Sequence, residues 1–145
     1  MAHNKKFGDY MAAAVVVPPA AVTSTRLEFS SVNATGYDRA TFIFQMGAPS
    51  STDAYLSSGN LIWNAATSGA TYTAVAGGSF GTHITGGAMS KANFVIDVNV
   101  DQAKPWLKVS ASNVSSTGYY AVLCVLRTPV SKPPTSLTGQ MVYVD

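Results

Sequence analysis

The segment 93–100 limits the possible folds most, because its polar and apolar side chains fall on opposite sides of an extended chain. Asp97 and Asn99 lie on one side. The other side carries four apolar residues, Phe94, Ile96, Val98 and Val100. A period of two residues is that of a strand with one face in a core and one face in solvent. The segment therefore predicts a half-buried β-strand.

Further segments have the same extended character, and Gly and Pro residues separate them. The last of these segments follow one another at a spacing close to the roughly 8–12 residues typical of sandwiches and barrels. No long window shows a helical apolar period together with helix caps. We therefore expect an all-β antiparallel sandwich without long helices. The expected strands are 26–29, 40–46, 61–63, 71–75, 93–100, 106–112 and 119–126, with a short strand or extended tail at 140–144.

The apolar positions of these strands predict the core. Cys124 lies within 119–126, the most hydrophobic of the strands. It is the only cysteine of the chain and has no partner for an internal disulfide, so we expect a buried, unreactive thiol. The predicted core residues are Phe42, Phe44, Phe94, Ile96, Val98, Leu107, Val109, Val122 and Cys124.

The chain of 145 residues has the length of one domain, and we expect an apolar segment beyond each end of it. Residues 1–25 are predicted as an extended N-terminal arm, because Pro18 and Pro19 stop a helix. The body would span 26–129, and 130–145 would form a Pro-rich linker with a C-terminal β segment. Apolar arms favour contacts between subunits. The predicted contact residues are Met11, Val15, Val16, Val17, Met141, Val142 and Tyr143.

A secretory signal peptide is a second interpretation of the N-terminus, because Lys5 and Lys6 precede the apolar stretch 11–17. However, Asp9 interrupts the approach, and Pro18 ends the stretch at the short limit for a signal peptide. The arm is therefore the preferred interpretation. No stretch approaches the roughly 20 apolar residues of a membrane span.

Charge and residue chemistry argue against catalysis and against binding to nucleic acid or membranes. Charged residues make up 11% of the chain, against about 25% in typical soluble domains. The net charge of +2 comes from scattered Lys and Arg, whereas nucleic acids and anionic membranes need clustered ones. His3 and His83 lie far apart and lack the spacing of a metal site. The sequence also contains no G-x-S-x-G nucleophile elbow. We therefore expect that the protein is not an enzyme and that it binds no cofactor and no metal.

Aromatic residues leave a different class of function open. Trp63 and Trp106 are candidates for stacking on sugar rings, as in a carbohydrate-binding module. The same residues also serve as cross-strand pairs in ordinary sheets.

The order of three segments resembles the small head-decoration, or cement, proteins of tailed bacteriophages. A turn runs into an apolar strand at 36–44, beginning Gly-Tyr-Asp-Arg-Ala. The strand Trp-Leu-Lys-Val-Ser-Ala-Ser follows at 106–112, and the long apolar strand comes at 119–126. The resemblance covers about 26–129. The chain departs from the family in the middle, at 60–78, where a Ser-, Gly- and Thr-rich stretch replaces the polar segment of the family.

The resemblance implies a jelly-roll-like β-sandwich that assembles into dimers or trimers. Such proteins are assembled in the host cytoplasm and sit on the outer surface of the capsid in the virion, where their partner is the major capsid protein. They cement neighbouring capsid subunits against the pressure of packaged DNA. The alternative is a carbohydrate- or receptor-binding module of a phage fibre or tail.

Overall fold

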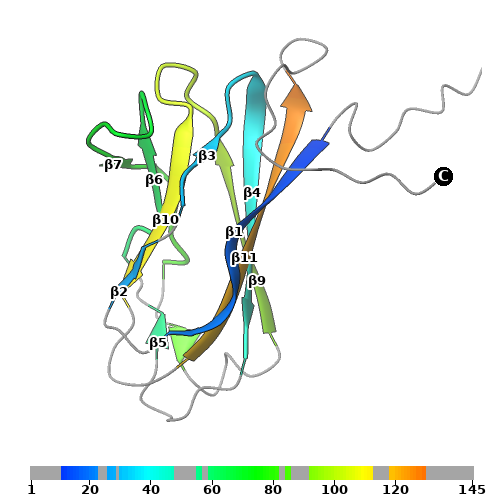
Figure 1. The fold of residues 1–145 in the computed structure, drawn as a ribbon, viewed down its shortest axis with the longest axis vertical. Coiled ribbons are helices and arrows are strands. Elements are labelled where there is room, and N and C mark those ends of the chain that lie inside the picture. Colours follow the sequence, from blue (N-terminus) through cyan, green and yellow to red (C-terminus); the bar gives the residue numbers. More distant parts are fainter. Residues whose placement is uncertain are drawn as a thin grey trace, which may run out of the picture.

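The computed structural model of the chain describes residues 11–22, 26–28, 30–47, 55–56, 59–81, 84–85, 92–112 and 118–129. Within these ranges the chain forms strands, turns and bends and contains no helix. Two antiparallel sheets pack face to face, as Figure 1 shows edge-on. The expected all-β sandwich is therefore confirmed.

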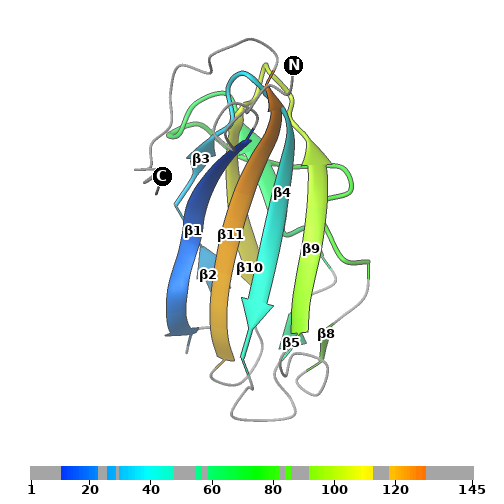
Figure 2. The same cartoon turned by 90° about the vertical axis from the view of Figure 1, so that its right-hand side faces the viewer.

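The first sheet has four strands in the order β1-β11-β4-β9. Their bounds are Met11–Val22 for β1, Gly118–Pro129 for β11, Tyr37–Met46 for β4 and Ala92–Asn99 for β9. Figure 2 faces this sheet and shows the four strands side by side. All neighbours are antiparallel. The predicted strands 40–46, 93–100 and 119–126 are thus the three adjacent strands β4, β9 and β11.

The second sheet is built around β10, Trp106–Ser112. It runs in the order β2-β10-β6-β7, and β3 also pairs with β10. A separate pair, β5-β8, completes the described strands. The bounds are Arg26–Glu28 for β2, Val32–Asn33 for β3, Tyr55–Leu56 for β5, Ile62–Ala65 for β6, Thr73–Ala74 for β7 and Ile84–Thr85 for β8.

The core lies between the sheets and follows the alternation seen in the sequence. Eight of the nine predicted core residues are buried: Phe42, Phe44, Ile96, Val98, Leu107, Val109, Val122 and Cys124. Phe94 is only partly buried and packs against the core from near the start of β9. It stands edge-to-face with Phe80, whose ring also meets Phe44, at centroid distances of 5.7 and 5.3 Å. Phe80 shields this end of the core, a role that the sequence did not predict.

The N-terminal boundary of the body requires a correction. Residues 1–25 were expected as an arm outside the sandwich, but Met11–Val22 pairs with β11 along its whole length, from Met11 opposite Arg127 to Val22 opposite Gly118. Ala12 is 1% exposed and belongs to the core. β1 is an edge strand, and the register shifts beside Val17 accommodate the two prolines. Edge strands and bulges are the places where a sheet tolerates proline.

The turn before β4 fixes how the two sheets meet at one end. Gly36 has φ of +84°, a conformation that glycine adopts without steric cost. The side chain of Gln102 bridges this turn, because its Oε1 accepts a hydrogen bond from Gly36 N at 3.1 Å and its Nε2 donates to Tyr37 O at 2.7 Å. Ala34 N donates to Pro105 O at 2.8 Å. The loop before β10 is thereby tied to the start of β4.

Candidate functional site

Two solvent-facing sheet surfaces carry the side chains that ordinary core packing does not explain. The first is the outer surface of β11, β4 and β9, here named the arginine face. It consists of Arg39, Thr41, Ile43, Val95, Asp97, Asn99, Leu123 and Arg127.

An apolar row crosses the arginine face. The register places Val95 opposite Ile43, and Ile43 opposite Leu123. Residues directly opposite one another share a face of the sheet. Val95 is 56% exposed, and Ile43 and Leu123 are partly exposed. The row therefore presents aliphatic surface to solvent from three adjacent strands.

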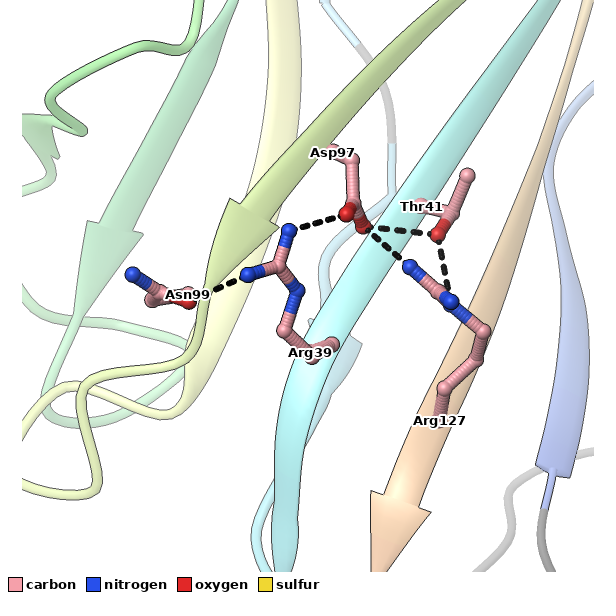
Figure 3. A network of polar contacts seen from close by, with 5 residues as sticks. All are labelled: Arg39, Thr41, Asp97, Asn99 and Arg127. Atoms are coloured by element: carbon pink, nitrogen blue, oxygen red, sulfur yellow. Dashed lines mark hydrogen bonds and ion pairs between the residues drawn. The ribbon is translucent and has the colours of Figure 1, made fainter.

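A charged network lies next to this row, drawn in Figure 3. The Asp97 carboxylate of β9 forms ion pairs with Arg39 of β4 and Arg127 of β11, the latter at 2.9 Å. Thr41 Oγ1 donates to Asp97 Oδ1 at 2.8 Å and accepts from Arg127 Nε at 3.0 Å. Arg39 Nη1 donates to Asn99 Oδ1 at 2.9 Å. One carboxylate thus holds two guanidinium groups in fixed positions, which leaves an excess of positive charge.

The network lowers the pKa of Asp97. Desolvation by partial burial acts to raise the pKa, but hydrogen bonds from Arg39, Arg127 and Thr41, with the charge of Arg127, outweigh it. The pKa therefore lies below the ordinary value of 3.8. The sequence correctly placed Asp97 and Asn99 away from the core but gave no sign of the arginines, which lie 58 and 30 residues from Asp97.

The outer surface of β6 and β10 with the adjoining Tyr72 is here named the tryptophan face. It consists of Trp63, Tyr72, Trp106, Lys108 and Ser110. Trp63 lies opposite Lys108, and Trp106 lies opposite Ala65. The two predicted sugar-stacking residues thus share one face of the sheet. Trp106 and Trp63 are both partly exposed.

A hollow of about 140 Å³ opens on the tryptophan face, lined by Trp63, Tyr72, Lys108 and Ser110. Lys108 Nζ stands 4.4 Å from the centre of the Tyr72 ring, within the range of a cation–π interaction. The indole Nε1 of Trp63 is buried and has no hydrogen-bond partner among the described residues. The sequence named Trp63 but not Tyr72, Lys108 or Ser110 as parts of one site, because only the strand register joins them.

The hairpin that carries Trp63 and Tyr72 is held in place by backbone contacts. Gly78 O accepts hydrogen bonds from Leu61 N at 2.7 Å and Ile62 N at 3.1 Å, and Val75 N donates to Ile62 O at 3.0 Å. Gly78 is buried against Ile62. These contacts fix the start of β6 and therefore the position of Trp63.

The predicted contact residues are divided by the structure. Met11, Val15, Val16 and Val17 lie in β1, at the edge of the first sheet, rather than in a separate arm. Their role in contacts between subunits stays a prediction. Met141, Val142 and Tyr143 lie outside the described residues, as do His3 and His83.

Cys124 is a buried core thiol, as predicted. Burial raises its pKa to about 12. A thiol with so high a pKa is almost entirely protonated at neutral pH and is a poor nucleophile.

Within the part of the chain that the structure describes, no three His, Cys, Asp or Glu residues come together as a metal site. The described ranges also contain no helix long and apolar enough to span a bilayer. No protein-family model matches this chain, and neither does any curated protein.

Proposed function

We propose that the protein is a structural virion protein that binds the exterior of a tailed-phage icosahedral capsid. There it cements neighbouring major capsid protein subunits against internal DNA pressure, and it also associates with itself. Support comes from where the family-like segments lie in the sandwich. The turn and strand at 36–44 lead into β4, and the two later segments form β10 and β11. Each of these three strands is an inner strand with a paired neighbour on both sides.

The observation that carries the proposal is the composition of the arginine face. Its apolar row of Ile43, Val95 and Leu123 lies beside Arg39 and Arg127. Protein interfaces typically combine an apolar centre with a polar rim, and arginine is enriched in them. Asp97 and Thr41 already hold the guanidinium groups in place, so little side-chain entropy is lost when a partner binds.

Cementing by such a protein is a thermodynamic effect. A partner that bridges neighbouring capsid subunits binds only the assembled shell, and selective binding to one state stabilises that state by mass action. Repeated over many equivalent positions, weak single contacts add through avidity. The arginine face needs only modest affinity for this role.

The test compares Val95→Asp with Thr71→Asp on heads prepared without this protein. Both variants add one negative charge, but Val95 lies in the apolar row and Thr71 is exposed beside the opposite sheet. We expect Thr71→Asp to bind the heads and to raise the temperature at which filled heads release DNA. Val95→Asp should keep its melting temperature and lose binding. Equal DNA retention with and without the wild-type protein would refute the proposal.

A carbohydrate- or receptor-binding module of a phage fibre or tail is the second candidate function. The tryptophan face favours it, since Trp63 and Tyr72 line one hollow there. Localisation of labelled protein on virions separates the two functions, because the first requires density over the shell lattice and the second requires density at the tail.

A further inference from the structure

β9 is the least protected edge among the described strands. Figure 2 shows it at one side of the first sheet, and the opposite edge, β1, contains two prolines and register shifts beside Val17. The edges of the second sheet are strands of two or three residues. Proline, lysine, bulges and shortness keep sheet edges from pairing with other chains. β9 has none of these features, since its eight residues pair with β4 in unbroken register and include no proline or lysine.

The hydrogen bond that follows β9 identifies which of its backbone groups point outward. Val100 N donates to Asp38 O at 2.8 Å, one position beyond the pair of Asn99 and Arg39. Residues of an antiparallel strand alternate between bonding with a given neighbour and facing away from it. Every second residue counted back from Val100 therefore bonds with β4, and the residues between them turn their N–H and C=O groups away from the sheet. These outward residues are Asn93, Val95, Asp97 and Asn99, and their backbone groups have no partner among the described residues.

The single charge of β9 does not keep a second strand away. Charges deter edge pairing when they point inward or lack a partner. Asp97 lies on the arginine face and already forms ion pairs with Arg39 and Arg127. A strand placed beside β9 would therefore meet a neutralised carboxylate.

The pattern of side chains along β9 selects one way for two copies of this strand to pair. A two-fold axis perpendicular to the sheet keeps the two arginine faces on the same side. With the axis at Val95, this residue lies opposite its own copy, and Asn93 lies opposite the partner's Asp97. An axis at Ile96 would set Val95 against the partner's Asp97, and an axis at Asp97 would set two carboxylates against each other. Apolar and hydrogen-bonded cross-strand pairs stabilise a sheet, whereas like charges directly opposite destabilise it.

The same axis continues the apolar row of the arginine face from one copy into the other. The row runs from Leu123 through Ile43 to Val95. It ends at β9 with a valine that is 56% exposed. Contact between this valine and the partner's Val95 would remove apolar surface of both copies from solvent. A second copy of the chain is thus the occupant that fits the edge in both backbone and side chains.

We propose that the protein forms a two-fold dimer in which β9 pairs antiparallel with the partner's β9 about an axis at Val95. Three pairs of outward residues exchange two hydrogen bonds each: Val95 with the partner's Val95, Asn93 with the partner's Asp97, and Asp97 with the partner's Asn93. The two first sheets join into one, and both arginine faces lie on the same side of it. Binding through two such faces at once would strengthen capsid binding through avidity. The inference rests on the self-association in the proposed function and specifies its surface.

Opposite charge changes at Asn93 test the register by sedimentation equilibrium of the purified protein. Asn93→Lys places an ammonium group opposite the partner's Asp97, and Asn93→Asp places a second carboxylate there. We expect the wild type to dimerise, the lysine variant to dimerise more tightly and the aspartate variant less tightly. Each change occurs twice in the dimer, so the dissociation constant should shift by about twofold to thirtyfold. The chain has a net charge of +2, so overall repulsion would produce the opposite order.

Single cysteines test the position of the axis. Cys124 is buried, so a thiol introduced on the exposed side of β9 reacts alone with a short bismaleimide. Val95→Cys should be cross-linked to a dimer, because directly opposite Cβ atoms lie about 4.5–5.5 Å apart. Asn99→Cys is the matched control on the same strand and face. It should stay monomeric on denaturing gels, since the two copies of this residue would lie about 27 Å apart along the paired strands.

Three outcomes overturn the inference. These are a wild type that stays monomeric up to its solubility limit, Asn93 variants that shift the dissociation constant in the same direction or not at all, and equal cross-linking of the two cysteine variants. The melting temperatures of the Asn93 variants, measured at low concentration, should match the wild type because Asn93 is exposed. Failure of the dimer is separate from failure of capsid binding. A monomer that decorates heads would refute the dimer alone, and a dimer that leaves heads undecorated would refute capsid binding alone.

Discussion

Replacement of Gly78 by alanine is the sharpest test of the packing behind the tryptophan face. A Cβ at this position would lie 2.9 Å from Ile62 Cβ, 3.0 Å from Val75 O and 3.1 Å from Ile62 O. Carbon atoms pack best at roughly 3.5–4.0 Å. Two of the three contacts are backbone oxygens and the third is a Cβ atom, so no flexible side chain can turn aside. The strand or the hairpin must shift.

The expected destabilisation follows from two opposing effects. Overpacking of this kind costs about 1–3 kcal/mol, whereas replacing glycine by alanine at a compatible position stabilises by about 0.4–1 kcal/mol through the unfolded state. The net loss should be about 1–2 kcal/mol. With roughly 2–4 °C per kcal/mol for a chain of this size, the melting temperature should fall by about 2–8 °C.

Gly69→Ala is the matched control for thermal unfolding followed by circular dichroism. Nothing lies within 4 Å of a Cβ at Gly69, and its φ is not positive. This variant should be as stable as the wild type or slightly more stable. If Gly78→Ala and Gly69→Ala melt at the same temperature, the close approach of Gly78 to β6 does not exist as described.

Three further predictions concern the rest of the sandwich. Ala12→Asp should lower the free energy of unfolding by several kcal/mol, since it buries a charge. Ala13→Asp, on the other side of β1, should lower it far less. Equal melting temperatures of the two variants would restore the arm interpretation. Asp97→Asn should lower the melting temperature at neutral pH. The folded-state pKa of Asp97 is lowered, so the stabilisation by its carboxylate is present above the unfolded-state pKa and is lost as the pH falls through the folded-state pKa. The wild type and Asp97→Asn should therefore melt at the same temperature in strong acid. A difference in melting temperature that persisted there would contradict the network. Cys124 should resist iodoacetamide in the native protein and react only after denaturation by urea, whereas rapid native labelling would place the thiol at the surface.

The strands with a period of two could be predicted because that period is a local property of the chain. β9 and β10 show it directly, and their inward residues form the core. β1 could not be predicted in the same way. Its sequence is apolar on both sides and contains two prolines, and only pairing with β11 makes it a strand. The sequence carried no local sign of that partner.

Both candidate surfaces depend on register, which the sequence does not reveal. Asp97 of β9 and Arg127 of β11 meet across the face of β4, which lies between these two strands. Lys108 lies against Tyr72 because the register of β10 and β6 places Lys108 opposite Trp63, on the face that also carries Tyr72. A shift of one residue would turn each of these side chains to the other face. The residue types were visible from the sequence, and their grouping was not.

The position of β11 has a consequence for biosynthesis. It emerges from the ribosome after every other described strand, yet it pairs with β1 on one side and β4 on the other. A nascent chain that ends before Gly118 therefore has β1 and β4 without their shared partner, and their unpaired edges are open to other chains. The first sheet closes only after β11 has been synthesised, through pairings distant in sequence that form slowly. During that interval the chain depends on chaperones, or on rapid synthesis and pairing of β11, to escape aggregation.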